Sequence, residues 1–428
     1  MGFVKHQMMR EESRGWRDGP NKHVCGECAD DEYLAQLIEA EADCDTCDYC
    51  GATSPDNAPI AAPVNVLLEA VAATVYHYWI DPAAELSYES AEGGYQGEVI
   101  DTREMVADHI GMSWEEELLD DVIASLTNEV WCKRHYARLD PDERLVFGWR
   151  EFEEITKHQS RFAALLPPIE KDEFSHPDDV PASEMLDEVA HCIHEVGLIS
   201  QIPAGTRIFR ARPHARAKVL HSAAELGAPT PEQAHFANRM SAAGIAVFYG
   251  AMDEATAVVE TFDPDDGGRD TVTVSQFATL RDLNILNLCD VPPIPSYFDV
   301  ERAPLRHAHL FVDAFVRAVS RSTIKDGQEH IEYVPTQIFA EYIRHRLRLE
   351  NGEPVHGILY PSAQVPGGRC CVLFCDQSAC LPEARAAWMQ HDQWLSLDET
   401  SVKVLDHDSC LASRKAIQDL VRAAKGEG

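Results

Sequence analysis

The chain has 428 residues, which is too long for one ordinary domain and predicts two or three. Its 45% hydrophobic and 25% charged residues exclude a disordered protein. The sequence has no uninterrupted apolar stretch of about 18 residues, so we predict no membrane span. The formal net charge of −35 argues against broad, nonspecific binding to nucleic acid, because an acidic surface repels phosphates.

The N-terminal residues indicate the compartment. The run MGFVKHQMMREESRGW is charged and lacks an apolar core followed by a small-residue cleavage site, so we expect no signal peptide and a cytoplasmic protein. In that compartment the 13 cysteines of the chain favour metal ligation or burial over disulfides.

Five N-terminal cysteines fall into C-x-x-C pairs, namely Cys25 and Cys28, then Cys44, Cys47 and Cys50. Tetrahedral zinc needs four thiolates, and two such pairs about 15 to 20 residues apart supply them. We favour Cys47 and Cys50 as the second pair, because Gly51 lets the turn adopt a positive φ, with Cys44 as the alternate ligand. The sequence predicts a structural zinc knuckle at residues 20–55; the alternative is a set of unmetallated thiols.

The next predicted elements are helices between about residues 60 and 165. The run VNVLLEAVAATVYHYWI repeats apolar residues at three- and four-residue steps. Further helix starts are marked by capping boxes or a leading proline, at Asp101, Ser113 and Pro141. We predict a small all-α bundle, followed by a linker at residues 166–182 that is rich in Pro, Asp and Glu.

The first chemically informative run of the C-terminal half is RIFRAR at residues 207–212. Its arginines alternate with apolar residues, as in a half-buried strand, so that Ile208 and Arg210 share one face. An arginine on a mostly covered face needs an anionic partner, and a pyrophosphate suits its fork of donors. An ion pair between Arg210 and a carboxylate of this acidic chain is the alternative.

The second run contains a strand and the helix that follows it. AVFYGA ends a predicted strand at Gly250, and Asp253 caps a helix that carries Glu260. Tyr249 therefore lies at the strand end, near the start of the helix. A carboxylate such as Glu260 can stabilise an oxocarbenium-like ribose, or it can simply pair with an arginine.

The third run, HGILYPSAQVPGGRCCVLF, predicts two strands joined by a glycine-containing loop. Ser362 follows the first strand, and Gly367 and Gly368 precede the second. A hydroxyl beside exposed backbone amides can bind a phosphate or ribose oxygen. No histidine or lysine spacing marks Ser362 as an activated nucleophile, so we assign it to binding.

These three runs, in this order, resemble the RES family of bacterial NAD-consuming toxins, whose α+β fold is related to ADP-ribosyltransferases. The knuckle and bundle ahead of them, with the run WREFEEITKHQSRF at residues 149–162, resemble the HEPN/RES N-terminal domain. The resemblance implies an ADP-ribosyltransferase-like mixed sheet with helices, as a RES domain at residues 183–380. A C-terminal strand and helix at residues 381–428 would extend it.

The resemblance also implies the site and the reaction. The three name residues of the family match Arg210, Glu260 and Ser362, and the substrate-binding positions match Arg239, Tyr249, Tyr333, Gln337, Gly367 and Gly368. NAD+ would be cleaved between nicotinamide and ribose, with phosphate, water or a protein as acceptor. One departure is Arg369-Cys370 after the glycine pair, where members of the family often carry a polar residue such as Asn.

Partners and rival functions follow from the same resemblance. A toxin of this family acts beside an antitoxin protein that covers its site, and a homo-oligomer is a further expectation. The rivals are a non-catalytic module that senses NAD or ADP-ribose, and an RNA-binding or RNA-cleaving HEPN domain. Arg150 precedes His158 by eight positions, longer than the spacing of HEPN nucleases, so we expect a structural or regulatory role for that domain.

Overall fold

The computed structural model describes residues 11, 14–167, 176–321, 327–382 and 392–424. The chain forms two compact units. Unit 1 contains Met1–Asp140 and Ile294–His307, and unit 2 contains Pro141–Pro293 and Ala308–Gly428. Unit 1 is therefore completed by a segment that lies within the C-terminal half of the chain.

Unit 1 begins with a short antiparallel pair that frames the cysteines. Strand β1 (His23–Cys25) pairs with β2 (Ala61–Pro63), and α2 (Glu32–Ala40) lies between them in the chain. The Asp31 side chain caps α2 by accepting the amides of Tyr33 and Leu34, which satisfies two free donors of the first turn.

The other elements of unit 1 are short except for two helices. They are η1 (Gly26–Ala29), α3 (Asn65–Tyr78), β3 (Trp79–Ile80), α4 (Pro82–Glu85), β4 (Tyr88–Glu89), η2 (Ser90–Glu92), β5 (Gly94–Tyr95), β6 (Ile100–Asp101), α5 (Thr102–Glu104), the π-helical turn η3 (Met105–Ile110), α6 (Glu116–Ser125), β7 (Val130–Lys133) and η6 (Val300–Arg302). The core packs around α3, where Leu67, Val71 and Val75 are buried at helical spacing.

The segment predicted as an all-α bundle also contains a three-stranded sheet, in the order β3-β7-β6. The long periodic run ends as a helix at Tyr78, and the next two residues pair with β7. The predicted cap at Asp101 is confirmed, because its side chain accepts the Glu104 amide. The predicted cap at Ser113 is wrong: α6 starts at Glu116 without a side-chain cap, and the Ser113 amide donates to Asp30 instead.

Unit 2 combines helices with one large sheet. Its elements are α7 (Pro141–His158), η4 (Ala163–Leu165), α8 (Ala182–Val196), β8 (Ile199–Ile202), β9 (Arg207–His214), α9 (Ala223–Leu226), η5 (Pro231–Gln233), β10 (Phe248–Ala251), α10 (Glu254–Thr261), β11 (Thr271–Thr279), β12 (Leu283–Asn287), α11 (Ala303–Val319, which begins in unit 1), α12 (Glu329–Glu332), α13 (Val334–His345), β13 (Gly357–Pro361), β14 (Arg369–Leu373), η7 (Gln377–Ala379), β15 (Cys380–Pro382), β16 (Leu395–Asp406) and α14 (His407–Ala424).

The sheet of unit 2 has nine strands in the order β15-β16-β11-β9-β10-β14-β13-β12-β8. Neighbours are antiparallel except for the parallel pairs β12–β13 and β15–β16. The predicted α+β class with a mixed sheet is confirmed. The order places β9, β10, β14 and β13, which carry the three informative runs, side by side.

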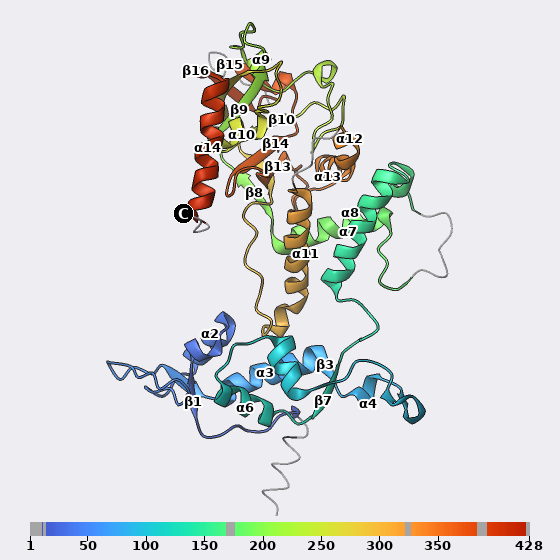
Figure 1. Ribbon diagram of the computed structural model, residues 1–428, viewed down its shortest axis with the longest axis vertical. Coiled ribbons are helices and arrows are strands. Elements are labelled where there is room, and N and C mark those ends of the chain that lie inside the picture. The colour runs from blue at the N-terminus through green and yellow to red at the C-terminus, as the bar shows by residue number, and fades with distance from the viewer. Residues whose placement is uncertain (1–10, 12–13, 168–175, 322–326, 383–391, 425–428) are drawn as a thin grey trace, which may run out of the picture. The chain divides into compact units, whose positions relative to one another are not determined.

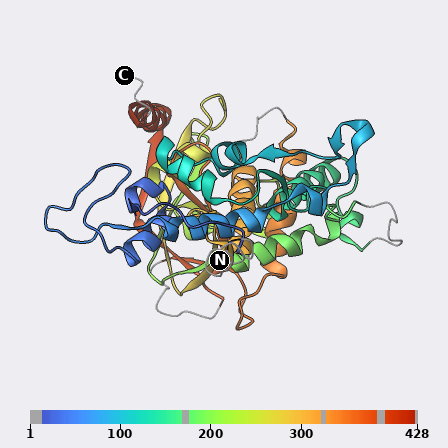
Figure 2. The ribbon, with the colours of Figure 1, turned by 90° about the horizontal axis from the view of Figure 1, so that it is seen from below.

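The two faces of this sheet are covered by different cores. Ile208 and Phe248 belong to a large core on one face, whereas Ala211 and Ala251 pack on the other face against α10 and α14. Figure 1 and Figure 2 both show α14, in red, alongside the sheet next to β16. None of the helices in the described part of the chain combines the length and hydrophobicity needed to span a bilayer.

Two predicted segments lie partly outside the described residues. Residues 168–175 of the predicted linker (166–182) are among them, and α8 already begins at Ala182. Residues 383–391 and 425–428 of the predicted C-terminal extension are the others.

Candidate functional site

Four cysteines of unit 1 form a cluster that can hold a metal ion. The sulfur atoms of Cys25, Cys28, Cys47 and Cys50 all lie within 4.8 Å of one another. Sγ of Cys25 is 3.7 Å from that of Cys28 and 3.7 Å from that of Cys50, and the Cys28 and Cys47 sulfurs are 3.8 Å apart. Tetrahedral ligands with metal–sulfur bonds of about 2.3 Å are roughly 3.8 Å apart. The donor set fits a tetrahedral metal, and Cys44 lies outside the cluster.

Backbone amides support thiolates in this cluster. The Cys25 amide donates to the Cys47 sulfur at 3.4 Å. Although burial acts to raise the pKa of Cys47, amides of Cys50, Tyr49 and Cys25 outweigh it and lower that pKa to about 7. Gly51 has the predicted positive φ, +71°, and its amide closes the turn on the Cys47 carbonyl at 3.1 Å. Thiolate is the form that binds a metal, so the turn favours ligation through Cys47, whereas burial raises the pKa of Cys25 and of Cys28.

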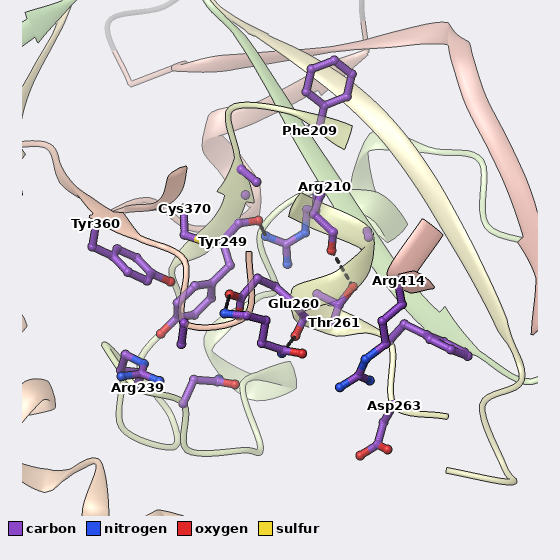
Figure 3. Close-up of a pocket in the computed structure, with 18 of the residues that line it drawn as sticks. Phe209, Arg210, Arg239, Tyr249, Glu260, Thr261, Asp263, Tyr360, Cys370 and Arg414 are labelled. Carbon is purple, nitrogen blue, oxygen red and sulfur yellow. Dashed lines mark hydrogen bonds between the residues drawn. The ribbon is translucent and has the colours of Figure 1, made fainter. Parts of the chain in front are cut away.

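A cavity of about 570 Å³ opens in unit 2 beside the α10 face of the sheet. Its lining brings together β9, β10, α10, the β13–β14 hairpin and α14, elements far apart in the sequence. Five residues predicted as site residues line it, namely Arg210, Arg239, Tyr249, Glu260 and Tyr333 (Figure 3). The cavity is large enough for a small-molecule ligand.

Glu260 lines this cavity, and Ser362, which does not line it, contacts the Glu260 carboxylate. Glu260 lies in the last turn of α10, which starts at the predicted cap, where Asp253 accepts the Thr256 amide at 2.8 Å. The Ser362 hydroxyl donates to Oε1 of Glu260, and the Gln364 amide donates to the same oxygen at 3.2 Å. Among the described residues no cation pairs with Glu260, so the sequence alternative of an arginine ion pair is not what orients it.

The loop that carries Ser362 depends on its two glycines. Gly367 has φ +73°, the left-handed region that disfavours side chains. A Cβ at Gly368 would lie 2.7 Å from the Thr256 hydroxyl, which leaves no room for a side chain between the loop and α10. The Gly368 carbonyl accepts the Ser362 amide at 2.8 Å. Both glycines therefore bring the loop, and with it Ser362, against the helix that carries Glu260.

Arg210 is buried at the back of the cavity without a counter-ion. It lies on the face of β9 shared with Ile208, and its guanidinium is 4.7 Å from the Phe248 ring. NH1 donates to the Tyr249 carbonyl at 2.7 Å, whereas Nε has no partner in the described structure. Burial, followed by repulsion from Arg212, lowers the pKa of Arg210 to about 9. The sequence alternative, an ion pair with a carboxylate, is absent among the described residues.

A buried cation without a counter-ion destabilises the fold at neutral pH, where it stays charged. We therefore expect Arg210→Met to increase the free energy of unfolding by about 1–3 kcal/mol, since methionine keeps the unbranched stem and loses only one hydrogen bond. Chemical denaturation of the full chain at pH 7, followed through the unfolding of unit 2, measures this change. Arg212→Met is the matched control, because Arg212 is half-buried on the same strand, has an unpartnered Nε and does not line the cavity. A marked loss of stability in Arg210→Met alone would contradict the expectation.

The other predicted residues differ in how they contribute. The Tyr249 ring lines the cavity, while its hydroxyl accepts the Met240 amide at 3.0 Å and contacts the Ser241 hydroxyl. Burial raises the pKa of Tyr249 to about 12, so this hydroxyl stays neutral. NH1 of Arg239 donates to the carbonyls of Val319 and Arg321, and within the described part of the chain its other nitrogens have no hydrogen-bond partner.

Gln337 does not line the cavity. Its Nε2 donates to the carbonyls of Asn238 at 2.8 Å and Ser241 at 3.3 Å. It is buried, and it anchors the segment that presents Arg239. Its contribution is to position that segment.

Comparison with protein-family models identifies both halves of the chain. Residues 207–398 match the RES domain, and residues 40–168 match HEPN/RES N-terminal domain 1. The chain is a RES-domain protein. No curated protein and no solved structure matches it.

The cavity is also lined by residues that the sequence did not reveal. Tyr360 and Cys370 line the cavity from β13 and β14, and burial raises the pKa of both groups. Arg414 lines it from α14, beyond the end of the RES-domain match. The alternation of the hairpin strands could have indicated the first two, but nothing near Arg414 in the sequence distinguishes it from a solvated helix face.

Arg369 and Cys370, which depart from the RES pattern after the glycine pair, have different surroundings. Arg369 points to Asp290, with which it forms two short contacts of 2.9 and 2.6 Å, and it does not line the cavity. Cys370, one residue on, faces the cavity because successive residues of a strand alternate.

The residues considered for a HEPN nuclease do not form a comparable site. Arg150 and His158 both lie on α7, and His158 is 4.0 Å from Glu154 on the same exposed helix face. Neither residue lines the cavity that holds Glu260, or the two smaller pockets beside Gly197 and beside Val274. The arrangement is typical of a solvated helix surface.

Proposed function

We propose that the RES domain cleaves the bond between nicotinamide and ribose in NAD+, with inorganic phosphate or another acceptor taking the ADP-ribosyl group. The observation that carries this proposal is Glu260, a carboxylate at the cavity wall that is oriented by Ser362 and has no ion pair among the described residues. Departure of nicotinamide leaves an oxocarbenium-like ribose, and a carboxylate stabilises the charge as it develops.

The remaining residues would bind the substrate. Glu260 would accept a hydrogen bond from a ribose hydroxyl, while Ser362 donates to its Oε1 and holds the carboxylate in place. Arg210 would provide positive charge for the phosphates from the back wall, and Arg239, which lies beside Tyr249 and Tyr360, would donate to the carboxamide of the nicotinamide. The tyrosines Tyr249, Tyr333 and Tyr360 line the cavity and would hold the flat nicotinamide ring. Among the described residues the Ser362 hydroxyl donates to Glu260 and has no histidine or lysine partner, so we assign it to orienting Glu260 and not to nucleophilic attack.

We also propose that the four-cysteine cluster binds zinc. Four thiolates at tetrahedral spacing are the donor set that structural zinc prefers, and they leave no open coordination position for a substrate. The zinc would stabilise the β1–β2 region of unit 1 and would take no part in the cleavage of NAD+.

Nicotinamide release from NAD+ by the purified protein, with and without inorganic phosphate, tests the proposed reaction. We expect release that depends on phosphate and yields ADP-ribose 1″-phosphate. Release without phosphate would identify water or a protein as the acceptor. Binding of NAD+ by well-folded protein without any release would overturn the enzyme and favour the NAD-sensing module.

A toxin of this kind would deplete its host cell of NAD+. We propose that expression of the chain lowers cellular NAD+ and arrests growth, and that an antitoxin covering the cavity would prevent both. Measurement of NAD+ after induced expression tests this role, and unchanged NAD+ at full expression of soluble protein would contradict it.

A further inference from the structure

The C-terminal helix α14 brings a free arginine to the cavity. Arg414 is half-buried and lines the same cavity as Arg210 and Glu260. Among the described residues it has neither an ion pair nor a hydrogen bond. A partly buried arginine on a strongly acidic chain ordinarily finds a carboxylate, so a guanidinium that stays free at a cavity wall is available to an anionic ligand.

The packing of α14 against α10 determines where Arg414 lies. Cys410, one turn earlier on the same face of α14, is fully buried among Val258 and Phe262 of the α10 region. The His407 ring packs edge-on against Phe262 at 5.4 Å, and Lys403 forms an ion pair with Glu254 just before the helix starts. α14 is thus fixed against α10, and its next turn directs Arg414 toward the cavity (Figure 3).

The two ends of the cavity differ in character. Figure 3 shows Arg239 and Tyr360 on one side of Glu260 and Arg414 on the other. Tyr249 and Tyr360 lie on the Arg239 side, where a nicotinamide ring would stack, and Asp263 lies beside Arg414 on the other side. With the nicotinamide ribose at Glu260, the rest of a dinucleotide would extend toward Arg414.

We infer that Arg414 binds the phosphate of the AMP half of the dinucleotide, so that the C-terminal extension completes the substrate site of the RES domain. The RES-domain match ends at residue 398, before α14 begins, so the extension adds a substrate-binding residue to the matched domain. This inference rests on the proposed cleavage of NAD+. Arg414 acts in binding and does not touch the bond that breaks.

The variant Arg414→Gln tests the inference through two substrates. With NAD+ we expect KM to rise about 10- to 100-fold with kcat unchanged, as for the loss of a charge-assisted hydrogen bond made equally in the ground and transition states. With nicotinamide mononucleotide, which lacks the AMP half, wild type and variant should have equal kcat/KM. Equal losses with both substrates, or no change with NAD+, would overturn the assignment.

The matched control is Lys415→Gln, which removes one positive charge from the adjacent, exposed position of the same helix. It should leave KM unchanged, and a similar rise in KM would show that Arg414 acts only through net charge.

Calorimetric binding of ADP to the full chain separates this inference from the proposed reaction. Weaker ADP binding in Arg414→Gln supports the subsite even if the wild type releases no nicotinamide. Nicotinamide release by both proteins with unchanged ADP binding would overturn the subsite and leave the proposed reaction standing.

Discussion

Glu260→Gln is expected to lower kcat for nicotinamide release by about 100- to 1,000-fold, the loss typical when one electrostatic contact to a transition state is removed. Glutamine keeps the shape of the side chain, and its carbonyl oxygen can still accept the hydrogen bonds from Ser362 and the Gln364 amide. Only the negative charge is lost. Because that charge acts on the oxocarbenium-like ribose and hardly on bound NAD+, KM should change little.

Steady-state kinetics of nicotinamide release, with thermal unfolding as a check on the fold, measure this effect. Glu254→Gln is the matched control, since Glu254 is a carboxylate of the same helix that pairs with Lys403 and does not line the cavity. We expect Glu254→Gln to retain activity. If Glu260→Gln kept kcat within about twofold of wild type, Glu260 would not stabilise the transition state.

Metal removal should have the largest effect on stability. The β1–β2 pair has three residues in each strand and encloses a long stretch of mostly irregular chain, so the ladder alone is too small to hold this region. Structural zinc in small knuckles contributes roughly 10–16 kcal/mol of apparent binding free energy, which is also folding free energy. We expect Cys47→Ser, or treatment with a strong chelator, to unfold the segment from Cys25 to Ala61 and to expose it to protease.

Metal content by mass spectrometry and limited proteolysis of the full chain check this expectation. Cys44→Ser serves as the control, because Cys44 lies near the cluster but outside its four ligands. It should retain one metal ion per chain and its protease resistance. A metal-free Cys47→Ser protein as resistant as wild type would contradict a structural metal.

Local patterns predicted much of the C-terminal unit. Alternation identified β9, short apolar runs identified β10, β13 and β14, and the Asp253 cap correctly marked the start of α10. Each of these signals depends on residues within a few positions of one another. The same reasoning failed at Ser113, whose amide donates to Asp30, 83 residues away, while α6 starts at Glu116 without a side-chain cap. It also missed the small sheet of unit 1, whose two-residue strands exist only because distant segments pair.

By itself the sequence determined the C-x-x-C framework, the order of strands and helices that carries the RES motifs, and the α+β class, because spacing and periodicity are encoded locally. Only the tertiary structure decided which partners those residues have. It selected Cys47 and Cys50 over Cys44, joined Ser362 to Glu260 across 102 positions, left Arg210 without a counter-ion and turned Arg414 toward the cavity. The physical reason is that a partner is chosen by which strands and helices become neighbours, here β9, β10, β14, β13 and α14, and that order depends on the packing of the whole unit.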